Sequence, residues 1–170
     1  GVKPDIMTSA KGLGSGMPIG AIIAKKQIME HWKRGAHGNT FGGNPLSCAA
    51  AIATLDLVQS EYAANAARVG EHFMGRLREM QRDYPCIGEI RGKGLMIGME
   101  LIENDAERTP ARALCDRLVT RGYHNGLLLL ACGVSTLRFM PPLSTTIAEV
   151  DEAIGLLRNS LDEALQGKGA

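Results

Sequence analysis

Two short apolar runs, 5–10 and 19–24, flank a glycine-rich segment near the start of the chain. Their apolar character, with β-branched residues in the second run, predicts two buried strands. Residues 46–58 form a longer, alanine-rich run that is apolar on most sides, which predicts a helix packed inside a larger structure. Asn44 and Pro45 precede this run, and they are typical of an N-cap and a first helical turn.

The middle of the chain has the pattern of a long amphipathic helix. Within 62–82, apolar residues repeat at helical spacing at Val69, Phe73, Leu77 and Met80. Proline disfavours helix in the residue before it, so a helix end and a domain boundary are expected just before Pro85. The sequence therefore predicts two domains, 1–84 and 85–170.

The second predicted domain has a different pattern, in which short strands alternate with helices. Thr109 and Pro110 predict the start of one helix. Thr146 and Glu149 have the spacing of a capping box ahead of a final amphipathic helix. We expect a small α+β layer here, a mostly antiparallel sheet with helices on one face. The predicted strands are 87–91, 95–101, 126–131 and 136–140.

The first predicted domain does not look self-contained. Two strands and two very apolar helices would leave much apolar surface uncovered, and such surface marks a missing partner. The chain as a whole, at 170 residues and 45% hydrophobic, has enough apolar material to bury a real core. We therefore expect the uncovered surface to gather in the first domain.

Charge and targeting signals narrow the classes of partner. The chain has 19 Lys and Arg against 18 Asp and Glu, so no basic surface for nucleic acid is evident. It has no apolar run long enough to span a bilayer and no signal-peptide pattern. We therefore expect a cytoplasmic protein with neither a nucleic-acid nor a membrane partner.

The cysteines predict no metal centre. Cys48, Cys86, Cys115 and Cys132 are widely spaced, without a C-x-x-C pair, which indicates neither a zinc site nor a redox motif. The four could pair in principle, but the absence of a secretory signal favours reduced thiols.

Lys11 follows the first apolar run and precedes Gly12, Gly14 and Gly16. Removing water from an ammonium is costly and favours the neutral amine, which can attack a carbonyl carbon. The glycines permit positive φ and leave room for a bulky group. The stretch thus indicates a lysine nucleophile beside space for a planar cofactor. A surface loop with a solvated lysine is the alternative, and spacing alone does not decide between the two.

Two phosphate-binding motifs are similar to this stretch but do not match it. A Walker loop places its lysine after the glycines and follows it with Ser or Thr, whereas Lys11 precedes them. The dinucleotide-binding fingerprint requires glycine where Ile19 stands. Neither nucleotide-binding class is therefore indicated.

A second glycine-rich, polar patch covers 35–45 and leads into the predicted helix. Unpaired N–H groups at a helix N-terminus attract anions, and Thr40 adds a hydroxyl donor just upstream. The alternative is a capped loop that binds nothing.

Three stretches, PDIMTSAKGLGSGMPIGA at 4–21, HGNTFGGNPL at 37–46 and RGKGLMIG at 91–98, form a further pattern. Together and in this order they resemble the class III pyridoxal-phosphate-dependent aminotransferases, of the 4-aminobutyrate and ornithine type. Three ordered matches are more specific than any one of them. The resemblance covers essentially the whole chain and implies an α/β fold. That fold is the C-terminal part of a fold-type I transferase, the end of its large domain followed by an α+β small domain.

The resemblance implies a role for three residues. Lys11 would form a Schiff base with pyridoxal 5'-phosphate and, once displaced by the substrate amine, would move a proton as a base. Thr40 would donate to the phosphate of the neighbouring subunit's cofactor in a homodimer. Arg138 would bind a substrate carboxylate, for which a planar guanidinium is suited. The alternative for Arg138 is a strand-end salt bridge.

The implied reaction moves an amino group from an amino acid to a 2-oxo acid such as 2-oxoglutarate. An ω-amino acid such as 4-aminobutyrate is the expected donor. Acetylornithine-type transaminases, aminomutases and amino-acid racemases share the same motifs, so they remain alternatives. A non-catalytic fragment with a role in assembly is another.

Members of the family are considerably longer than this chain. The aspartate that keeps the pyridine nitrogen protonated, the first phosphate-binding loop and the stacking aromatic residue normally lie upstream of the position of Gly1. Since the electron sink depends on that aspartate, we expect the 170-residue chain alone to be inactive or nearly so.

Overall fold

The computed structural model describes residues 1–103 and 106–167. The chain forms two compact units, Gly1–Glu61 and Tyr62–Ala170. Residues 104–105 and 168–170, which fall in the predicted second domain, lie outside the described residues. Within the described part, every helix is too short or too polar to cross a membrane.

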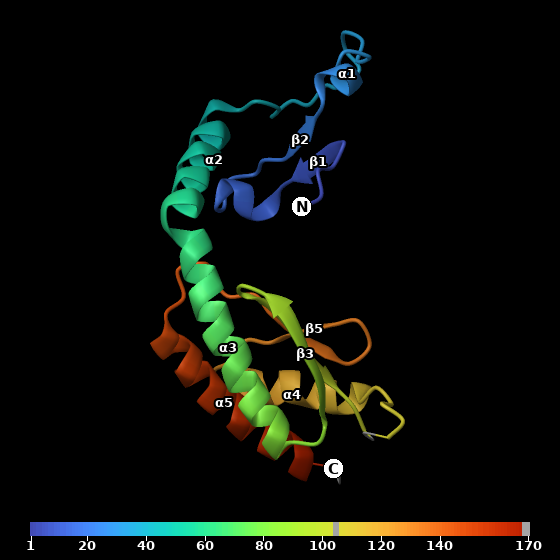
Figure 1. The fold of residues 1–170 in the computed structure, drawn as a ribbon, viewed down its shortest axis with the longest axis vertical. Coiled ribbons are helices and arrows are strands. Elements are labelled where there is room, and N and C mark those ends of the chain that lie inside the picture. Colours follow the sequence, from blue (N-terminus) through green and yellow to red (C-terminus); the bar gives the residue numbers. More distant parts are fainter. Residues whose placement is uncertain (104–105, 168–170) are drawn as a thin grey trace. The chain divides into compact units, whose positions relative to one another are not determined.

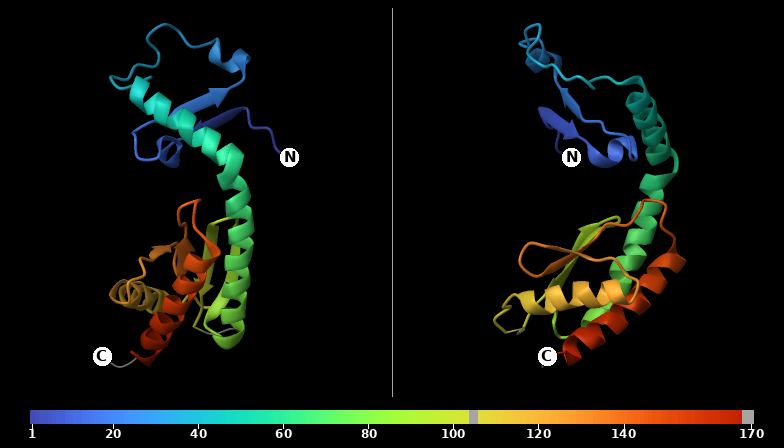
Figure 2. Two further views of the ribbon diagram at one scale, coloured as in Figure 1. Left: turned by 90° about the vertical axis from the view of Figure 1, so that its left-hand side faces the viewer. Right: turned by 180° about the vertical axis from the view of Figure 1, so that it is seen from behind.

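Unit 1 consists of a two-stranded hairpin, a 3₁₀ turn and two α-helices (Figure 1). The two strands pair in antiparallel register, and a 3₁₀ turn lies in the connection between them. The long helix of the unit packs against this turn (Figure 2). The elements are β1 (Ile6–Ser9), η1 (Lys11–Gly14), β2 (Ala21–Ala24), α1 (Lys26–Met29) and α2 (Pro45–Leu57).

Helix α2 begins where the sequence predicted. The side-chain oxygen of Asn44 accepts hydrogen bonds from the backbone N–H groups of Leu46 and Ser47, both at 3.1 Å. Pro45 occupies the first helical position, where a missing N–H leaves no hydrogen bond unmade. The predicted N-cap is therefore confirmed.

Unit 1 leaves much apolar surface uncovered, as expected. In α2, Leu46 and Ile52 are exposed, and in the hairpin Ile6 and Ile23 are 55% and 52% exposed. The prediction that both strands are buried is therefore wrong for this chain. The reason is that the described residues of unit 1 supply no second layer to cover the hairpin.

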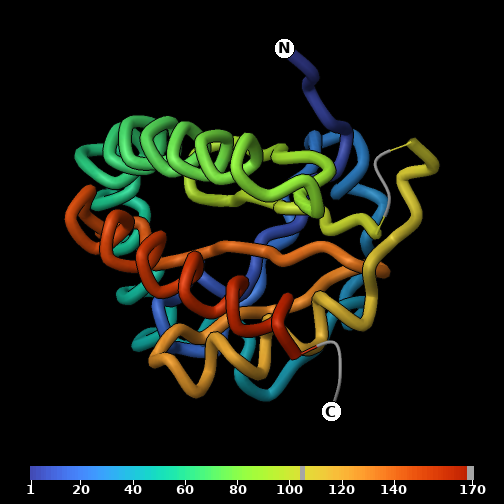
Figure 3. Tube along the Cα trace, turned by 90° about the horizontal axis from the view of Figure 1, so that it is seen from below, coloured from blue at the N-terminus to red at the C-terminus, as the bar shows by residue number. Residues whose placement is uncertain are grey.

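Unit 2 is a four-stranded antiparallel sheet with three helices packed on it (Figure 1). The strand order is β3-β4-β6-β5. Figure 3 shows α5 running between α3 and α4, and α5 contacts both. The elements are α3 (Ala63–Asp83), β3 (Ile87–Lys93), β4 (Met96–Leu101), α4 (Arg112–His124), β5 (Leu130–Cys132), β6 (Thr136–Phe139) and α5 (Ile147–Gln166).

One face of this sheet carries the core. Along β4, Ile97, Met99 and Leu101 are buried, whereas the residues between them are only partly covered. Successive strand residues point to opposite faces, so this alternation marks one covered face and one open face. Leu137 and Phe139 of β6, which pair with Met99 and Ile97, extend the covered face. The predicted sheet with helices on one face is what the structure contains.

The boundary between the units differs from the predicted one. It falls at the end of a π-helical turn, η2 (Val58–Tyr62), rather than near Pro85. Helix α3 therefore belongs to unit 2. Its buried residues Val69, Phe73 and Leu77 belong to the core that the sheet and α5 complete. A proline that ends a helix marks a change of element, whereas a domain boundary depends on where the helix packs.

Two local predictions in unit 2 also need correction. Thr109 does not cap α4, because Ala111 is the N-cap residue and no side chain caps the helix. The predicted strand 126–131 is reduced to β5, which begins at Leu130. The backbone N–H of Leu127 instead bonds to the carbonyl of Gly122 at 2.8 Å, so this segment completes the end of α4.

The capping box at the start of α5 is confirmed. Thr146 Oγ1 accepts from the Glu149 N–H at 3.3 Å, and the Glu149 carboxylate accepts from the Thr146 N–H at 2.8 Å. Hydrogen bonds from the Thr146 backbone and then its side chain lower the pKa of Glu149 below its ordinary value of 4.5.

Thr146→Ala is expected to lower the free energy of unfolding by about 1 kcal/mol at neutral pH, because it removes the cap hydroxyl. The bonds to Glu149 favour its ionised form in the folded state. Their contribution is therefore present above pH 4.5 and is lost as the pH falls through the lowered pKa. Urea unfolding at several pH values measures both effects. An equal difference between wild type and Thr146→Ala at pH 7 and pH 3 would contradict the role of Glu149.

Candidate functional site

Lys11 occupies a tight turn directly after a strand. Strand β1 ends at Ser9, and Lys11 begins η1. Its φ of 55° lies in the left-handed region, which is uncommon for a residue with a side chain. The side chain is exposed and makes no hydrogen bond or ion pair with any described residue. The amine is therefore available to a group that approaches from solvent.

The predicted burial of Lys11 is not found. The residue is exposed, and the hairpin that carries it is uncovered on both faces. A reactive neutral amine would be favoured by loss of water around Lys11. That environment requires a surface from outside the described residues of unit 1.

The three glycines beside Lys11 have different structural roles. Gly16 has a φ of 107°, so it alone of the three needs the conformational freedom of glycine. Gly14 is buried, and a Cβ there would lie 2.8 Å from Ile19 Cγ2. Gly12 has neither a positive φ nor a close neighbour, since an added Cβ would have nothing within 4 Å. The predicted freedom is needed at one position and close packing at another.

Thr40 lies in the loop that leads into α2. Asn39 shapes this loop, because its side-chain oxygen accepts from the Phe41 N–H at 2.9 Å and its carbonyl from the Gly42 N–H at 3.0 Å. Thr40 itself is exposed, and its hydroxyl bonds to no described residue. The hydroxyl is therefore available to a ligand or to another chain.

A cavity of about 560 Å³ lies within unit 1, between the hairpin and this loop. Its polar lining includes Ser9, Asn39 and Ser47, while Ile19 and Phe41 contribute apolar surface. Lys11 and Thr40, both described by the structure, do not line it. Unit 1 therefore does not bring the two predicted cofactor contacts into one cavity.

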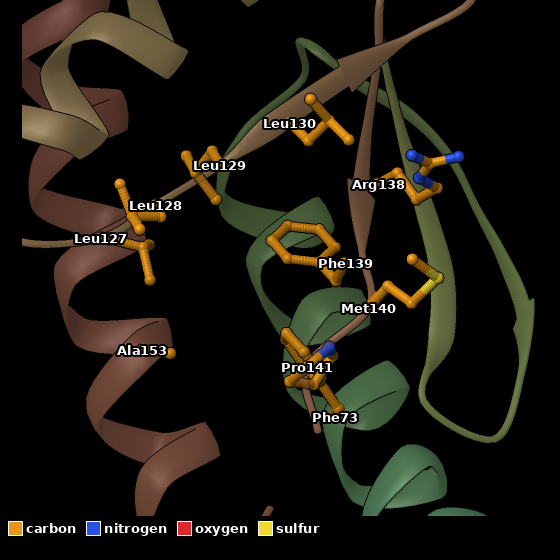
Figure 4. Close-up of a pocket in the computed structure, with 10 residues that line it drawn as sticks. All are labelled: Phe73, Leu127, Leu128, Leu129, Leu130, Arg138, Phe139, Met140, Pro141 and Ala153. Carbon is orange, nitrogen blue, oxygen red and sulfur yellow. The ribbon is translucent and has the colours of Figure 1, made fainter. Parts of the chain in front are cut away.

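Arg138 belongs to unit 2 and lies on the open face of the sheet. It is in β6, opposite Gly98 of β4 and Leu130 of β5. Figure 4 shows its side chain directed away from that of Phe139, which faces the helices. Its Nε is buried and has no hydrogen-bond partner among the described residues.

The carboxylates on the same open face are already paired. Glu89 accepts from Arg91 at 2.9 Å, and Glu100 accepts from Arg108 at 3.1 Å. No ion pair to Arg138 is formed within the described residues. The alternative of a strand-end salt bridge for Arg138 is therefore not supported, and its guanidinium is available to an external carboxylate.

Sequence reasoning missed two features near these residues. A mainly apolar cavity of about 300 Å³ adjoins Arg138, and Leu127–Leu130, predicted as strand, line it (Figure 4). The second is a hydrogen bond between the hydroxyls of Thr54 and Ser15, which joins α2 to the Lys11 turn. Neither feature could be recognised from a short stretch of sequence, because each is formed by residues that are distant in the sequence.

Comparison with known proteins gives the same family at the level of sequence. The model of the family described as aminotransferase class III matches residues 1–161. The chain is 44% identical over 164 residues to acetylornithine aminotransferase of Caldanaerobacter subterraneus subsp. tengcongensis, covering 96% of the chain and 39% of that protein. It is 36% identical over 166 residues to 5-aminovalerate aminotransferase DavT of Pseudomonas aeruginosa, again covering 96% and 39%.

Solved structures agree. An aminotransferase of Bacillus anthracis matches with a TM-score of 0.89 at 32% identity, over 95% of this chain and 39% of that one. An amine transaminase from an uncultivated Pseudomonas species, solved in its PLP-bound form, matches with a TM-score of 0.86 at 32% identity, over the same shares.

The chain spans about 39% of the length of these two curated relatives. Its position within their length stays a prediction. The family match nevertheless covers most of the chain, and the solved structures share its fold. The chain belongs to the class III aminotransferase family.

Proposed function

We propose that this chain carries the cofactor lysine of a pyridoxal-phosphate-dependent aminotransferase, which moves an amino group from an amino acid to a 2-oxo acid. The observation that carries the proposal is the state of Lys11. Its amine is exposed and has no partner among the residues that the structure describes, and it lies on a left-handed turn directly after a strand, inside a stretch that matches the family.

The chemistry of the donor set fits this cofactor. The aldehyde of pyridoxal phosphate requires an amine, its phosphate requires hydroxyl and N–H donors, and a substrate carboxylate requires a cation. Lys11 supplies the amine, Thr40 a hydroxyl donor and Arg138 the cation. The described residues form no hydrogen bond with the Lys11 amine, the Thr40 hydroxyl or the Arg138 Nε. When bound, pyridoxal phosphate supplies an electron sink at the substrate carbon.

Each residue has one role in the proposal. Lys11 holds the cofactor through Nζ and, once released, takes and returns a proton as a neutral amine. Thr40 donates its hydroxyl proton to a phosphate oxygen. Arg138 binds the substrate carboxylate through two parallel N–H···O bonds, a geometry that a guanidinium provides and an ammonium does not.

We place Thr40 and Lys11 on different cofactors of a homodimer. In this arrangement Thr40 of one subunit contacts the phosphate held by Lys11 of the other. The absence of a shared cavity for the two residues in unit 1 supports this part of the proposal. The cytoplasmic location and the dimer both stay predictions.

The proposed amino donor is an ω-amino acid. Relatives named for acetylornithine and 5-aminovalerate support this class more broadly than 4-aminobutyrate alone. A transaminase assay of the complete enzyme against these three donors, with 2-oxoglutarate as acceptor, would rank them.

A non-catalytic piece with a role in assembly is the second candidate. The uncovered apolar residues of α2 and the hairpin favour it, because surface of this kind is normally covered by another chain or domain. The two candidates differ in whether Lys11 reacts selectively with pyridoxal phosphate.

Lys11 is expected to be the preferred site of pyridoxal phosphate on this chain. The protein is incubated with the cofactor, its visible absorbance is recorded, and borohydride then fixes the adduct for peptide mapping. We expect the label to be concentrated on Lys11 and the visible band to be lost in Lys11→Ala, because Lys11 lies in a stretch that matches the family and its exposed amine forms no ion pair with a described residue.

Lys26→Ala is the matched control, since Lys26 is also exposed and lies in unit 1. It is expected to keep both the band and the Lys11 label. A label spread evenly over the lysines, or an unchanged band in Lys11→Ala, would overturn the proposed role. The non-catalytic candidate would then be preferred.

A further inference from the structure

The Lys11 turn is conformationally demanding. Three of its residues lie in the left-handed region, Lys11 at φ 55°, Ser15 at φ 45° and Gly16 at φ 107°. Glycine adopts such angles freely, whereas residues with a side chain do so at a cost in free energy. Strained positions of this kind persist only where the surrounding structure holds them.

Two of the three backbone hydrogen bonds within the turn are long. Leu13 N–H bonds to the Ala10 carbonyl at 3.2 Å, and Ser15 N–H to the Gly12 carbonyl at 3.3 Å. These two distances lie at or just beyond the long end of the usual range for N–H···O bonds, whereas the third bond, from Met17 N–H to the Gly14 carbonyl, is 3.0 Å long. The longest of the three bonds is that of Ser15, so a further contact at Ser15 would add the most to the order of the turn.

Thr54 provides that contact from α2. Its Oγ1 lies 2.8 Å from Ser15 Oγ and 2.8 Å from the carbonyl oxygen of Ala50. A carbonyl can only accept, and a hydroxyl has one proton to donate. The Thr54 proton therefore goes to Ala50, and Ser15 donates its own proton to Thr54. In this arrangement the Thr54 hydroxyl both donates and accepts, and it joins Ser15 to the backbone of α2.

The partner of the turn is itself fixed. Thr54 lies near the end of a helix whose start is capped by Asn44 and whose side packs against η1. Among the described residues, this hydroxyl pair is the one side-chain hydrogen bond between α2 and the turn. Ser15 is thus contacted by a capped helix at one of the two residues with side chains whose φ lies in the left-handed region of the turn.

We propose that Thr54 and Ser15 are positioning residues for Lys11. The Lys11 side chain has no hydrogen-bond or ion-pair partner among the described residues, so the backbone of the turn sets the point and direction at which this flexible side chain leaves the chain. Without the hydroxyl pair, Ser15 is free to leave the left-handed region and the turn loses its single conformation. The functional importance of this positioning rests on the proposed role of Lys11, whereas the contact itself does not.

Thr54→Val tests the contact without any cofactor. Valine keeps the β-branched shape and removes the hydroxyl. Solvent exchange of the Ser15 and Leu13 amides, measured by NMR on the whole chain, is expected to be roughly three- to tenfold faster, the effect of one neutral hydrogen bond. Thr54→Ser is expected to restore the wild-type rate. Unchanged exchange in Thr54→Val would overturn the inference.

Thr120→Val is the matched control. Thr120 Oγ1 also bonds to the carbonyl four residues before it, that of Asp116, at 3.1 Å, but it lies in α4 and contacts no part of the turn. It is expected to leave exchange at Ser15 unchanged. Equal acceleration in both variants would mean a general loss of helix stability, which would also overturn the inference.

The link to Lys11 is tested by the borohydride label. In Thr54→Val the share of label on Lys11, relative to Lys25 and Lys26 of the same molecules, is expected to fall roughly threefold or more, with rescue in Thr54→Ser. An unchanged share beside faster amide exchange would overturn the positioning role while leaving the proposed function intact. If wild type itself shows no preference for Lys11, the proposed function fails, and the exchange result still decides whether the hydroxyl pair holds the turn.

Discussion

Gly70→Ala is expected to lower the free energy of unfolding of unit 2 by roughly 3 kcal/mol or more. Gly70 lies in α3, where it packs directly on the turn between β3 and β4. A Cβ at this position would lie 2.1 Å from the carbonyl oxygen of Gly94 and 2.2 Å from its carbonyl carbon. These are backbone atoms, so no side-chain rotation can relieve the overlap.

The β3–β4 turn cannot easily move away from α3. Gly94 has a φ of 56°, and Leu95 beside it is 3% exposed within the core. Displacing the turn would therefore withdraw an apolar side chain from the interior as well as separate the helix from the sheet. The intrinsic preference of a helix for alanine over glycine, about 1 kcal/mol, is too small to offset this.

Gly75→Ala is the control for this prediction because Gly75 is in the same helix and an added Cβ would have nothing within 4 Å. It is expected to stabilise the protein by about 0.5–1 kcal/mol. Urea unfolding followed by circular dichroism measures both variants. If Gly70→Ala raised the free energy of unfolding as Gly75→Ala is expected to do, the Gly70 contact would not decide the packing of α3.

The features that the sequence predicted correctly are those with a local cause. The Asn44 cap of α2 and the Thr146 capping box each involve residues within a few positions of each other, and the structure contains both. The alternation in 95–101 likewise needs only a strand with one covered face. In each case the residues that decide the structure are neighbours in the chain.

The features that were missed depend on distant segments. The close approach of Gly70 to Gly94 joins a helix to a turn more than twenty positions away, and the Thr54–Ser15 bond spans 39 positions. Neither leaves a pattern in either segment alone. The boundary between the two compact units differs from the predicted domain boundary for the same reason, since only the packing of α3 on the sheet assigns this helix to unit 2.

For the candidate site, too, some features could be predicted from the sequence and others could not. Lys11, Thr40 and Arg138 could be named because their stretches match a family in order, and no property of the isolated residues was sufficient. The exposure of Lys11 could not be predicted, because it depends on what covers the hairpin. Among the described residues Arg138 has no partner, and this could be recognised only once the structure showed that Glu89 and Glu100 bond to other arginines.

Arg138→Met is expected to leave the stability of unit 2 unchanged or raise it by about 1 kcal/mol, while abolishing carboxylate binding at this position. The buried Nε of Arg138 has no partner among the described residues, and an unsatisfied buried donor costs stability. Methionine keeps the length of the side chain without the donor. A residue kept at such a cost is expected to serve a ligand rather than the fold.

Arg117→Met is the matched control in the same unit. The Nε of Arg117 donates to the carbonyl oxygen of Ala164 at 3.0 Å, so it joins α4 to α5. Its loss is expected to cost about 1 kcal/mol, because the carbonyl of the buried residue Ala164 then loses this donor. The two arginine variants should therefore shift the urea midpoint in opposite directions, or one of them not at all.

Ligand binding completes the test of Arg138. In the complete enzyme, 2-oxoglutarate should stabilise wild type and Arg117→Met against unfolding by mass action. For Arg138→Met we expect an affinity at least thirtyfold weaker, because the carboxylate loses its charge-assisted bonds. Destabilisation of Arg138→Met as large as that of Arg117→Met, with 2-oxoglutarate binding retained, would instead make Arg138 a structural residue of the sheet.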